Sequence, residues 1–493
     1  MTATVIAALL SAFSVYLFVG FFLGRKNRNL ADLIPLTGGH QAEIRNSAEF
    51  SSSTVATSIS LATVVLAFFE LAPELGVWLF WTVITTSIGL FCVRFVAKRI
   101  WIKLSAYDHR PTLHEFLGHE FNSRSLYLIG AACTSLGFLG AFAVELTVGS
   151  RFLASLIPEI PVWLAVSVLA LIGLAYTSYG GFRAVIVTDR IQMVSIWLFL
   201  AALLGFYFYF VQGHDGWVFN LANIPDEIKQ FTWREELPAF LLGVWVINVP
   251  TFISDMSVWQ RIAASQKPET VYRGLFSSVF ISALSWGLFV VTACLAFMVI
   301  VPREQVNPLL TLLNAIGGMN GLIPMMALFF VVLGLYGAML STASTQLIAV
   351  SHTVYEDLIS QGRKLKERID SARELWISRL ILITAALVSM GVVVILSSIG
   401  FSIADFVFAI YGAQLGLFPS IMAALFGDKT KLQKLSRWAS VSIASGFIAG
   451  WATAGYGKFI LNDEVVFLAP VSSLLVSSLI LGIGFLLLKK EKT

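Results

Sequence analysis

Charged residues are scarce in this sequence. Only 13% of its 493 residues are Asp, Glu, Lys or Arg, whereas 57% are hydrophobic. A soluble chain carries about a quarter charged residues. A larger core cannot hide such a deficit, so lipid must replace water over most of the surface. The scarcity excludes an ordinary soluble protein and predicts a polytopic helical membrane protein.

Cysteine is also rare, and the three that occur, Cys92, Cys133 and Cys294, lie within apolar stretches. We interpret them as small packing residues rather than disulfide partners or metal ligands. No P-loop is present, and the longest polar stretch, 353–377, is too short for a soluble domain. The segment 112–120 superficially resembles a zinc-protease helix, but its two histidines are five residues apart instead of four. We therefore expect no enzyme activity, no nucleic-acid partner and no obligate protein partner.

Thirteen apolar segments are long enough to cross a bilayer. They lie near 4–24, 48–71, 77–97, 126–156, 161–179, 187–211, 236–256, 275–301, 321–350, 378–399, 401–426, 438–456 and 465–488. The first is no ordinary signal peptide, because its basic residues Arg25, Lys26 and Arg28 follow the apolar stretch. We expect a retained span whose N-terminus is outside, and an odd number of spans then places the C-terminus in the cytoplasm.

The basic residues of short loops support this topology, since Lys and Arg concentrate on the cytoplasmic side of a membrane. Of the 33 Lys and Arg residues, those that fall outside or near the outer ends are Arg151, Lys229, Arg234, Arg303 and Lys458. Omitting one span would invert every later loop and abolish the bias. We predict a multi-pass protein of the cytoplasmic membrane.

Two of the spans contain unusually many hydroxyl groups. The stretch E49-F-S-S-S-T-V-A-T-S-I-S-L-A-T63 holds eight Ser and Thr residues, and Ser341, Ser344 and Thr345 share one face of a later helix. Hydroxyls, loosened carbonyls and a carboxylate suit Na⁺, a hard cation that prefers oxygen ligands. The alternative is that the hydroxyls bond back to carbonyls of their own helices.

A third polar stretch, Y176-T-S-Y-G-G-F-R-A184, connects two apolar spans. Its paired glycines, Gly180 and Gly181, permit a tight turn. Asp189 follows at the start of the next span. From the residues alone Asp189 either binds an ion, caps the helix N-terminus or pairs with Arg190.

This stretch, with Thr188, Asp189 and Gln192, resembles the signature of the sodium:solute symporter family, which includes sodium/proline, sodium/glucose and sodium/sialic acid symporters. A338-M-L-S-T-A-S-T-Q-L347, Y355-E-D-L358 and V258-W-Q-R-I-A-A-S265 resemble further motifs of that family, and the resemblance covers about residues 1–460.

The resemblance implies an all-α membrane protein with 13 transmembrane helices and a LeuT-type 5+5 inverted repeat, preceded by one extra helix and followed by two. We expect one transporter domain over 1–493, with the extra helix 4–24, the first repeat 48–211, the second repeat 236–426 and the final helices 438–488. The predicted spans agree, because spans two to six start inside and spans seven to eleven start outside.

The resemblance also implies a sodium site in which Ala56, Ile59 and Ala338 offer backbone carbonyls and Ser341 and Thr342 offer hydroxyls. Some members of the family bind a further sodium ion nearby. Its predicted ligands here are Asp189, Ser341, Ser344 and Thr345.

Solute-binding residues are expected beside the helix breaks. Pro250 removes a backbone donor and predicts a kink or break in the seventh span. The candidates are Ser60, Thr63, Trp78, Thr82, Phe138, Glu145, Asn248, Thr251, Tyr411 and Gln414. Asn248 resembles a substrate-binding Asn of the sugar-transporting branch, whereas Thr251 replaces an aromatic gate. Glu145 is an intramembrane carboxylate that either holds a cationic group of the solute or is a structural polar residue.

The sequence therefore predicts a secondary active transporter that couples inward Na⁺ movement to uptake of a small organic solute by alternating access. A sodium-independent channel or facilitator and a transporter-fold sensor remain alternatives. Amino acids or small carboxylates are the first expectation for the solute, and a sugar or sialic acid is the second.

Overall fold

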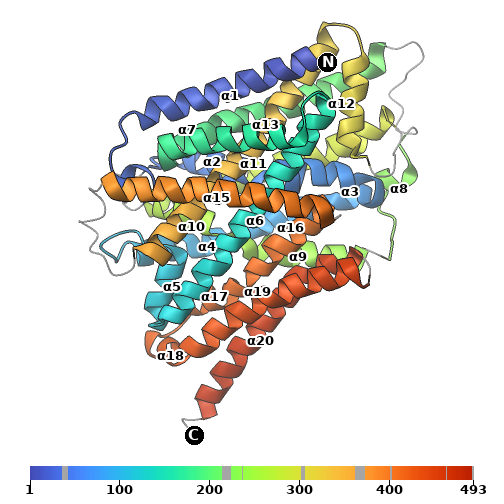
Figure 1. The fold of residues 1–493 in the computed structure, drawn as a ribbon. Coiled ribbons are helices and arrows are strands. Elements are labelled where there is room, and N and C mark those ends of the chain that lie inside the picture. Colours follow the sequence, from blue (N-terminus) through green and yellow to red (C-terminus); the bar gives the residue numbers. More distant parts are fainter. Residues whose placement is uncertain are drawn as a thin grey trace.

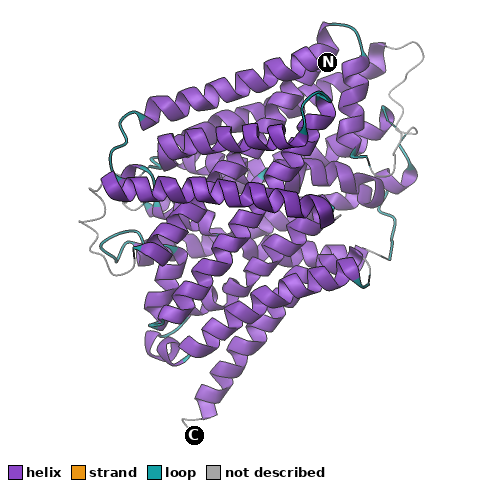
Figure 2. Ribbon diagram, in the orientation of Figure 1, coloured by secondary structure: helices purple, strands orange, loops and turns teal. Residues whose placement is uncertain are grey.

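The computed structural model describes residues 1–35, 43–213, 224–235, 237–300, 306–360, 372–399, 402–461 and 463–490, so Arg303 lies outside the described residues. These residues form helices and short connections, without a named strand (Figure 2). The α-helices are α1 (Thr2–Gly24), α2 (Ser47–Ser58), α3 (Ala67–Leu75), α4 (Phe80–Leu104), α5 (Leu113–Phe121), α6 (Arg124–Leu156), α7 (Val162–Gly213), α8 (Asp226–Lys229), α9 (Leu237–Ser254), α10 (Met256–Ala263), α11 (Pro268–Leu295), α12 (Pro308–Gly318), α13 (Leu322–Thr353), α15 (Ala372–Ile399), α16 (Ile403–Gln414), α17 (Phe418–Phe426), α18 (Lys429–Lys434), α19 (Ser436–Phe459) and α20 (Ala469–Lys490). Two π-helical segments, η3 (Leu61–Leu66) and η7 (Val354–Ile359), continue into or from these helices.

Ten helical stretches of the described chain are long and apolar enough to cross a membrane, as expected for a multi-pass membrane protein. Two of them, Leu61–Leu104 and Val162–Phe210, each extend over two predicted spans, and α19 is not among the ten. The predicted number of thirteen crossings depends on counting both long stretches twice and α19 once. That number and the inverted repeat stay predictions.

The centre of the molecule is α13, which packs against α1, α6 and α7 (Figure 1). All its residues from Gly334 to Thr353 are buried. Its hydroxyl groups consequently face other helices of the protein and not lipid, which is the environment that an intramembrane polar site requires.

The hydroxyl-rich span predicted at 48–71 is interrupted near its middle, as the family resemblance implies. Asn46 caps α2 by accepting a hydrogen bond from the Glu49 N–H, and α2 ends at Ser58. Ile59 (φ −98°, ψ 81°) and Ser60 (φ −82°, ψ 152°) leave the helical conformation, and a new helix starts at η3. The break exposes carbonyls at the end of one half-helix and N–H groups at the start of the other.

The helix α7 contains a second interruption, at Gly181, where φ is 68° and ψ is −169°. A Cβ atom at this position would lie 2.2 Å from the backbone oxygen of Asp32, so only glycine fits. The predicted turn at the glycine pair is therefore present. Asp189 lies two turns beyond it, inside the helix, so it does not cap a helix N-terminus as one alternative supposed.

The third interruption follows α9. Pro250 lies within the continuous helix, and the chain leaves the helical conformation only at Asp255 (φ −78°, ψ 117°). Of the kink or break predicted at Pro250, the break is not found there. The chain breaks five residues later, where Asp255 caps the next helix by accepting a hydrogen bond from the Ser257 N–H.

Candidate ion and solute site

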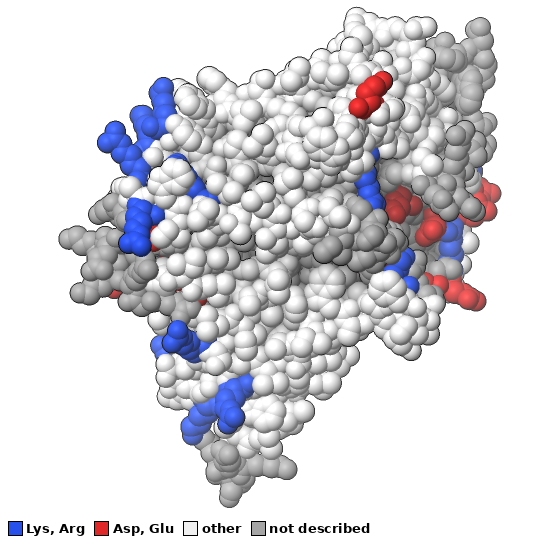
Figure 3. All heavy atoms as spheres, in the orientation of Figure 1, with Lys and Arg blue, Asp and Glu red and all other residues white. Residues whose placement is uncertain are grey.

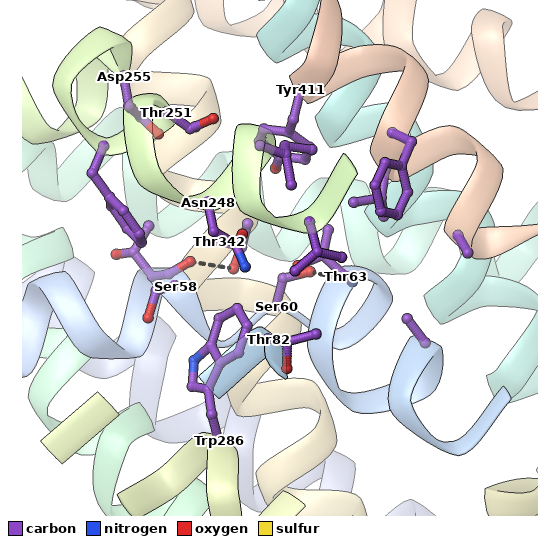
Figure 4. Close-up of a pocket in the computed structure, with 18 of the residues that line it drawn as sticks. Ser58, Ser60, Thr63, Thr82, Asn248, Thr251, Asp255, Trp286, Thr342 and Tyr411 are labelled. Carbon is purple, nitrogen blue, oxygen red and sulfur yellow. Dashed lines mark hydrogen bonds between the residues drawn. The ribbon is translucent and has the colours of Figure 1, made fainter. Parts of the chain in front are cut away.

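A cavity of about 160 Å³ lies between the broken span 48–71, α9, α11, α13 and α16. Figure 4 shows Asn248 and Thr251 of α9, and Asp255 just beyond its end, on one side of the cavity, with Ser58, Ser60 and Thr63 on the facing segment. The predicted solute residues that line it are Ser60, Thr63, Thr82, Phe138, Asn248, Thr251 and Tyr411. The cavity suits a small organic molecule, because its walls are mostly apolar with a few polar groups.

Three predicted solute residues do not line this cavity. Trp78 donates its indole N–H to the Thr232 carbonyl, 3.0 Å away, and packs edge to face on Phe231. Gln414 is buried and donates to the Ile410 carbonyl at 3.5 Å. Glu145 lies behind Ser60, whose hydroxyl donates to its Oε1 atom. Each of these side chains is bonded to protein instead of facing the cavity.

The cavity also contains polar residues that the prediction missed. Trp286 of α11, Gln346 of α13 and Asp255 line it (Figure 4 labels the first and last of these). Gln346 donates through Nε2 to the hydroxyl of Tyr411 at 3.1 Å. Asp255 had a detectable signal as a carboxylate within an apolar segment. Trp286 had none, since an aromatic residue in a span usually serves packing.

The hydroxyl-bearing face of α13 contacts the break in span 48–71. Thr342 Oγ1 donates a hydrogen bond to the Thr57 carbonyl, with a distance of 3.1 Å between the two oxygens. The Ile59 N–H bonds to the carbonyls of Val55 and Ala56 at 3.1 and 3.3 Å. Two parts of the chain almost three hundred residues apart are thus joined at the predicted sodium site.

The remaining predicted sodium ligands are buried in the same region. Ala56 lies in the last turn of α2, Ile59 follows the end of that helix, and Ala338 and Ser341 lie on α13, all with 0% exposure. The donors assembled there are carbonyl and hydroxyl oxygens, which match the preference of Na⁺. The assignment of these residues as sodium ligands stays a prediction.

Asp189 is the centre of a second buried network. Its Oδ1 accepts a hydrogen bond from Ser341 Oγ at 2.7 Å, and its Oδ2 accepts from Ser53 Oγ at 2.5 Å. Arg261 Nη2 lies 3.3 Å from the same Oδ2 atom. The partner of Asp189 is therefore Arg261 of α10, and not the adjacent Arg190 that one alternative named.

Arg261 connects this carboxylate to the other predicted ligands. Its guanidinium donates to Ser53 Oγ at 2.9 Å, Thr57 Oγ1 at 2.5 Å and Thr345 Oγ1 at 3.0 Å. Ser344 differs, because its hydroxyl donates to the Ser341 carbonyl of its own helix at 3.1 Å. The sequence did not reveal this role of Arg261, because the residue lies between the predicted spans 236–256 and 275–301, where a basic residue is ordinarily exposed in a loop.

The two histidines of 112–120 contact different groups. His114 Nδ1 lies 2.8 Å from Asp357 Oδ2, whereas Glu115 lies 2.9 Å from His109 and 3.6 Å from His119. Burial acts to raise the pKa of Glu115, but hydrogen bonds with the two histidines outweigh it and lower the pKa to about 2. This cluster is an ion-pair connection of α5 outside the apolar spans.

Comparison with known proteins identifies relatives of the chain. Residues 53–433 match the model of the Sodium:solute symporter family. The chain is 25% identical over 212 residues to the sodium/glucose cotransporter of Vibrio parahaemolyticus, covering 38% of this chain and 37% of that protein. It is 23% identical over 343 residues to the sodium/pantothenate symporter of Escherichia coli (strain K12), covering 69% and 65%. The matched region spans less than two thirds of either relative.

Solved structures share the fold at low sequence identity. A Na⁺-coupled sialic acid symporter in a substrate-bound outward-open state superposes with a TM-score of 0.73 at 17% identity, over 97% of both chains. Mhp1, a nucleobase-cation-symport-1 family transporter, superposes with a TM-score of 0.57 at 13% identity, over 94% of this chain and 96% of its own. The family resemblance drawn from the motifs is confirmed.

Proposed function

Because the chain belongs to the sodium:solute symporter family, we propose that it couples inward movement of Na⁺ to the uptake of a small organic solute. The observation that carries this proposal is the contact between Thr342 of α13 and the Thr57 carbonyl beside the break in span 48–71. It brings carbonyl and hydroxyl oxygens from two helices together within the hydrophobic part of the chain, where a bare cation otherwise has no ligands.

The sodium ligands are Ala56, Ile59 and Ala338 through their carbonyls, and Ser341 and Thr342 through their hydroxyls. This set fits Na⁺ because α2 ends at this point, and the Ala56 carbonyl, which accepts a hydrogen bond from the Ile59 N–H, still has a second lone pair for a cation. Ser341 donates its proton to Asp189, so the lone pairs of its oxygen remain available to a cation.

A second sodium ion is not required by this arrangement. The guanidinium of Arg261 bonds Asp189 and Thr345, which are two of the four predicted ligands of that ion. The guanidinium thus occupies the Oδ2 side of the carboxylate, whereas Oδ1 accepts a hydrogen bond from Ser341. The protein therefore carries one sodium ion per cycle, and Arg261 supplies the second positive charge from within the chain.

Transport proceeds by alternating access around the cavity. Two helix breaks border it, one at Ile59 and Ser60 and one at Asp255, and both give the chain positions at which half-helices can change direction. Sodium bound between α2 and α13 holds the broken span against α13 and stabilises the outward-open form. The solute then binds, the two helix groups rock, and both cargoes leave inside.

The protein lies in the cytoplasmic membrane. Its N-terminus is outside the cell and its C-terminus is in the cytoplasm. In support, Lys and Arg gather over the end of the molecule where α1 ends and where α5 and α18 lie (Figure 3). Asp and Glu, with a few basic residues, occupy the visible part of the opposite end. Basic residues favour the cytoplasmic side.

Uptake into proteoliposomes tests this function. Purified protein is screened for thermal stabilisation by a solute library with and without sodium, and the responding solute is then offered radiolabelled under an inward sodium gradient. Accumulation above the external concentration that collapses with a sodium ionophore supports coupled transport. Entry that stops at equal concentrations under every gradient contradicts it, because a channel or facilitator cannot concentrate its solute.

A further inference from the structure

The half-helix that starts after the break at Ile59 and Ser60 has a protein carboxyl group at its N-terminus. After the break the chain resumes as η3 and α3, which together form a half-helix from Leu61 to Leu75. The N-terminus of a helix carries a partial positive charge and N–H groups that have no partner within the helix. Such an end, beside a transport cavity, commonly holds an anionic group of the solute.

In this chain Glu145 of α6 holds that position. Its Oε1 accepts a hydrogen bond from Ser60, and the N–H groups of Leu61 and Ala62 lie beside the same carboxyl group. Ser60 also accepts a hydrogen bond from the Thr63 N–H at 3.0 Å, so its hydroxyl is occupied on both sides. Glu145 is 1% exposed, and its Oε2 has no hydrogen-bond partner among the described residues. A carboxyl group of the protein thus lies against the N-terminus of the half-helix, behind Ser60 and outside the cavity, so this helix end does not need an anionic group from the solute.

The described lining of the cavity offers no cationic side chain to an anion. Among the described residues that line it, there is no Lys, Arg or His, and Asp255 is the single charged residue. The Asp255 carboxylate accepts the Ser257 N–H at 2.6 Å and caps α10. The guanidinium of Arg261 is bound to Asp189 and reaches the cavity wall only through Thr57 and Thr345.

The polar atoms left over in the wall have a mixed character. Trp286 Nε1 can only donate, Gln346 Oε1 can only accept, and the Thr251 hydroxyl can do both. None of the three has a hydrogen-bond partner within the described part of the chain. Aromatic side chains, including Phe68, complete the wall and suit the carbon skeleton of a solute. Hydroxyl groups match this set, because each can donate and accept.

We propose that Glu145 takes the place of a solute carboxylate at the half-helix, so that the cavity accepts an uncharged solute bearing several hydroxyl groups. This inference rests on the proposed transport function and selects among its solute classes. It departs from the first expectation of an amino acid or carboxylate, because both carry the anionic group for which this cavity has no partner.

Chemical rescue tests the role of Glu145 without knowledge of the solute. Glu145→Ala removes a fragment with the size and charge of acetate, and Glu145→Gln keeps the size without the charge. We expect acetate to raise the unfolding temperature of Glu145→Ala above the value in equimolar acetamide, and to leave wild type and Glu145→Gln unchanged. Equal effects of acetate and acetamide, or an acetate effect on wild type, would overturn the proposal.

Matched solutes test the selectivity in the wild-type protein, and this arm stands when Glu145→Ala does not fold. Sugars and polyols are compared with the carboxylate and the amine of the same skeleton, for example glucose with glucuronate and glucosamine. In the set of three that binds most tightly, we expect the neutral solute to bind at least about tenfold more tightly than its carboxylate and its amine, which is about 1.4 kcal/mol. In Glu145→Gln we expect a smaller ratio between the dissociation constants of the carboxylate and the neutral solute.

The sodium dependence of binding separates the two proposals. Sodium-dependent binding of a carboxylate or an amine in preference to the neutral analogue refutes the role of Glu145 and leaves symport intact. Preference for the neutral solute without any effect of sodium supports the solute class and contradicts symport.

Discussion

Replacing Arg261 by Gln removes the guanidinium that lies beside Asp189. Both side chains are almost completely buried, with exposures of 1% and 0%, and the nitrogen–oxygen distance is 3.3 Å. Removing one partner of a buried ion pair leaves an uncompensated charge and costs about 3–5 kcal/mol. We expect a loss of free energy of unfolding in this range for Arg261→Gln in sodium-free buffer.

A double-mutant cycle isolates the pair. Asp189→Asn removes the carboxylate charge, so the double variant leaves no charge unpaired. We therefore expect it to be less destabilised than the sum of the two single variants, with an interaction free energy of about 1–3 kcal/mol. Denaturation in mixed micelles, followed by tryptophan fluorescence, measures the four free energies of unfolding.

Sodium supplies the second half of this test. Without the guanidinium, Na⁺ can approach Asp189, Ser341 and Thr345, so Arg261→Gln should gain a sodium-dependent stability that exceeds that of wild type. Above the dissociation constant, each tenfold increase in sodium adds about 1.4 kcal/mol for one additional bound ion. Choline chloride at equal ionic strength is the control. Additive single variants together with an unchanged sodium response would refute the idea that Arg261 replaces a cation.

Three further predictions address the proposed sodium site, the turn in α7 and the cluster of Glu115 with His109 and His119. Thr342→Val should raise the sodium concentration for half-maximal uptake by at least about tenfold, because it removes one proposed oxygen ligand of the ion, and a polar contact with a charged group is worth about 1.5–3 kcal/mol. Ser344→Ala should not, since that hydroxyl bonds its own helix. Gly181→Ala should lower stability by about 1–3 kcal/mol or prevent folding, while Gly205→Ala, whose Cβ meets nothing within 4 Å, should be neutral in the same unfolding assay. The lowered pKa of Glu115, about 2 against an ordinary 4.5, stabilises the fold above pH 4.5 and loses that contribution as the pH falls toward 2, so Glu115→Gln should flatten the acid limb of a stability–pH curve.

Local sequence signals predicted the positions of the helix breaks better than the contacts made across them. The hydroxyl-rich stretch around Ser60 and the glycine at Gly181 were both recognised, because helix propensity and positive φ are properties of one segment. Pro250 misled because a proline can be accommodated within a helix, whereas Asp255 caps the next one. Capping competes directly with helix continuation, and here it places the end of the helix at Asp255.

Partners distant in sequence could not be predicted. Asp189 and Arg261 are 72 positions apart, and Ser60 and Glu145 are 85 apart. The spacing of residues within one span says which face a side chain is on, but not which helix lies opposite. For the same reason Trp78 and Gln414 were assigned to the cavity although they contact other parts of the protein.

The proposals for Arg261 and Glu145 together determine the charge that moves in each cycle. One sodium ion with an uncharged solute carries one positive charge inward, so a membrane potential of 100 mV contributes about 2.3 kcal/mol. At about 1.4 kcal/mol per tenfold ratio, the potential alone then supports roughly fifty-fold accumulation. One sodium ion with a monovalent anionic solute would move no net charge, and two sodium ions with a neutral solute would square the ratio to about two thousand. Accumulation is therefore measured in proteoliposomes held at a series of potassium diffusion potentials. The slope of the logarithm of the accumulation ratio against membrane potential gives the number of charges moved per cycle. A slope that does not correspond to one charge contradicts at least one of the two assignments.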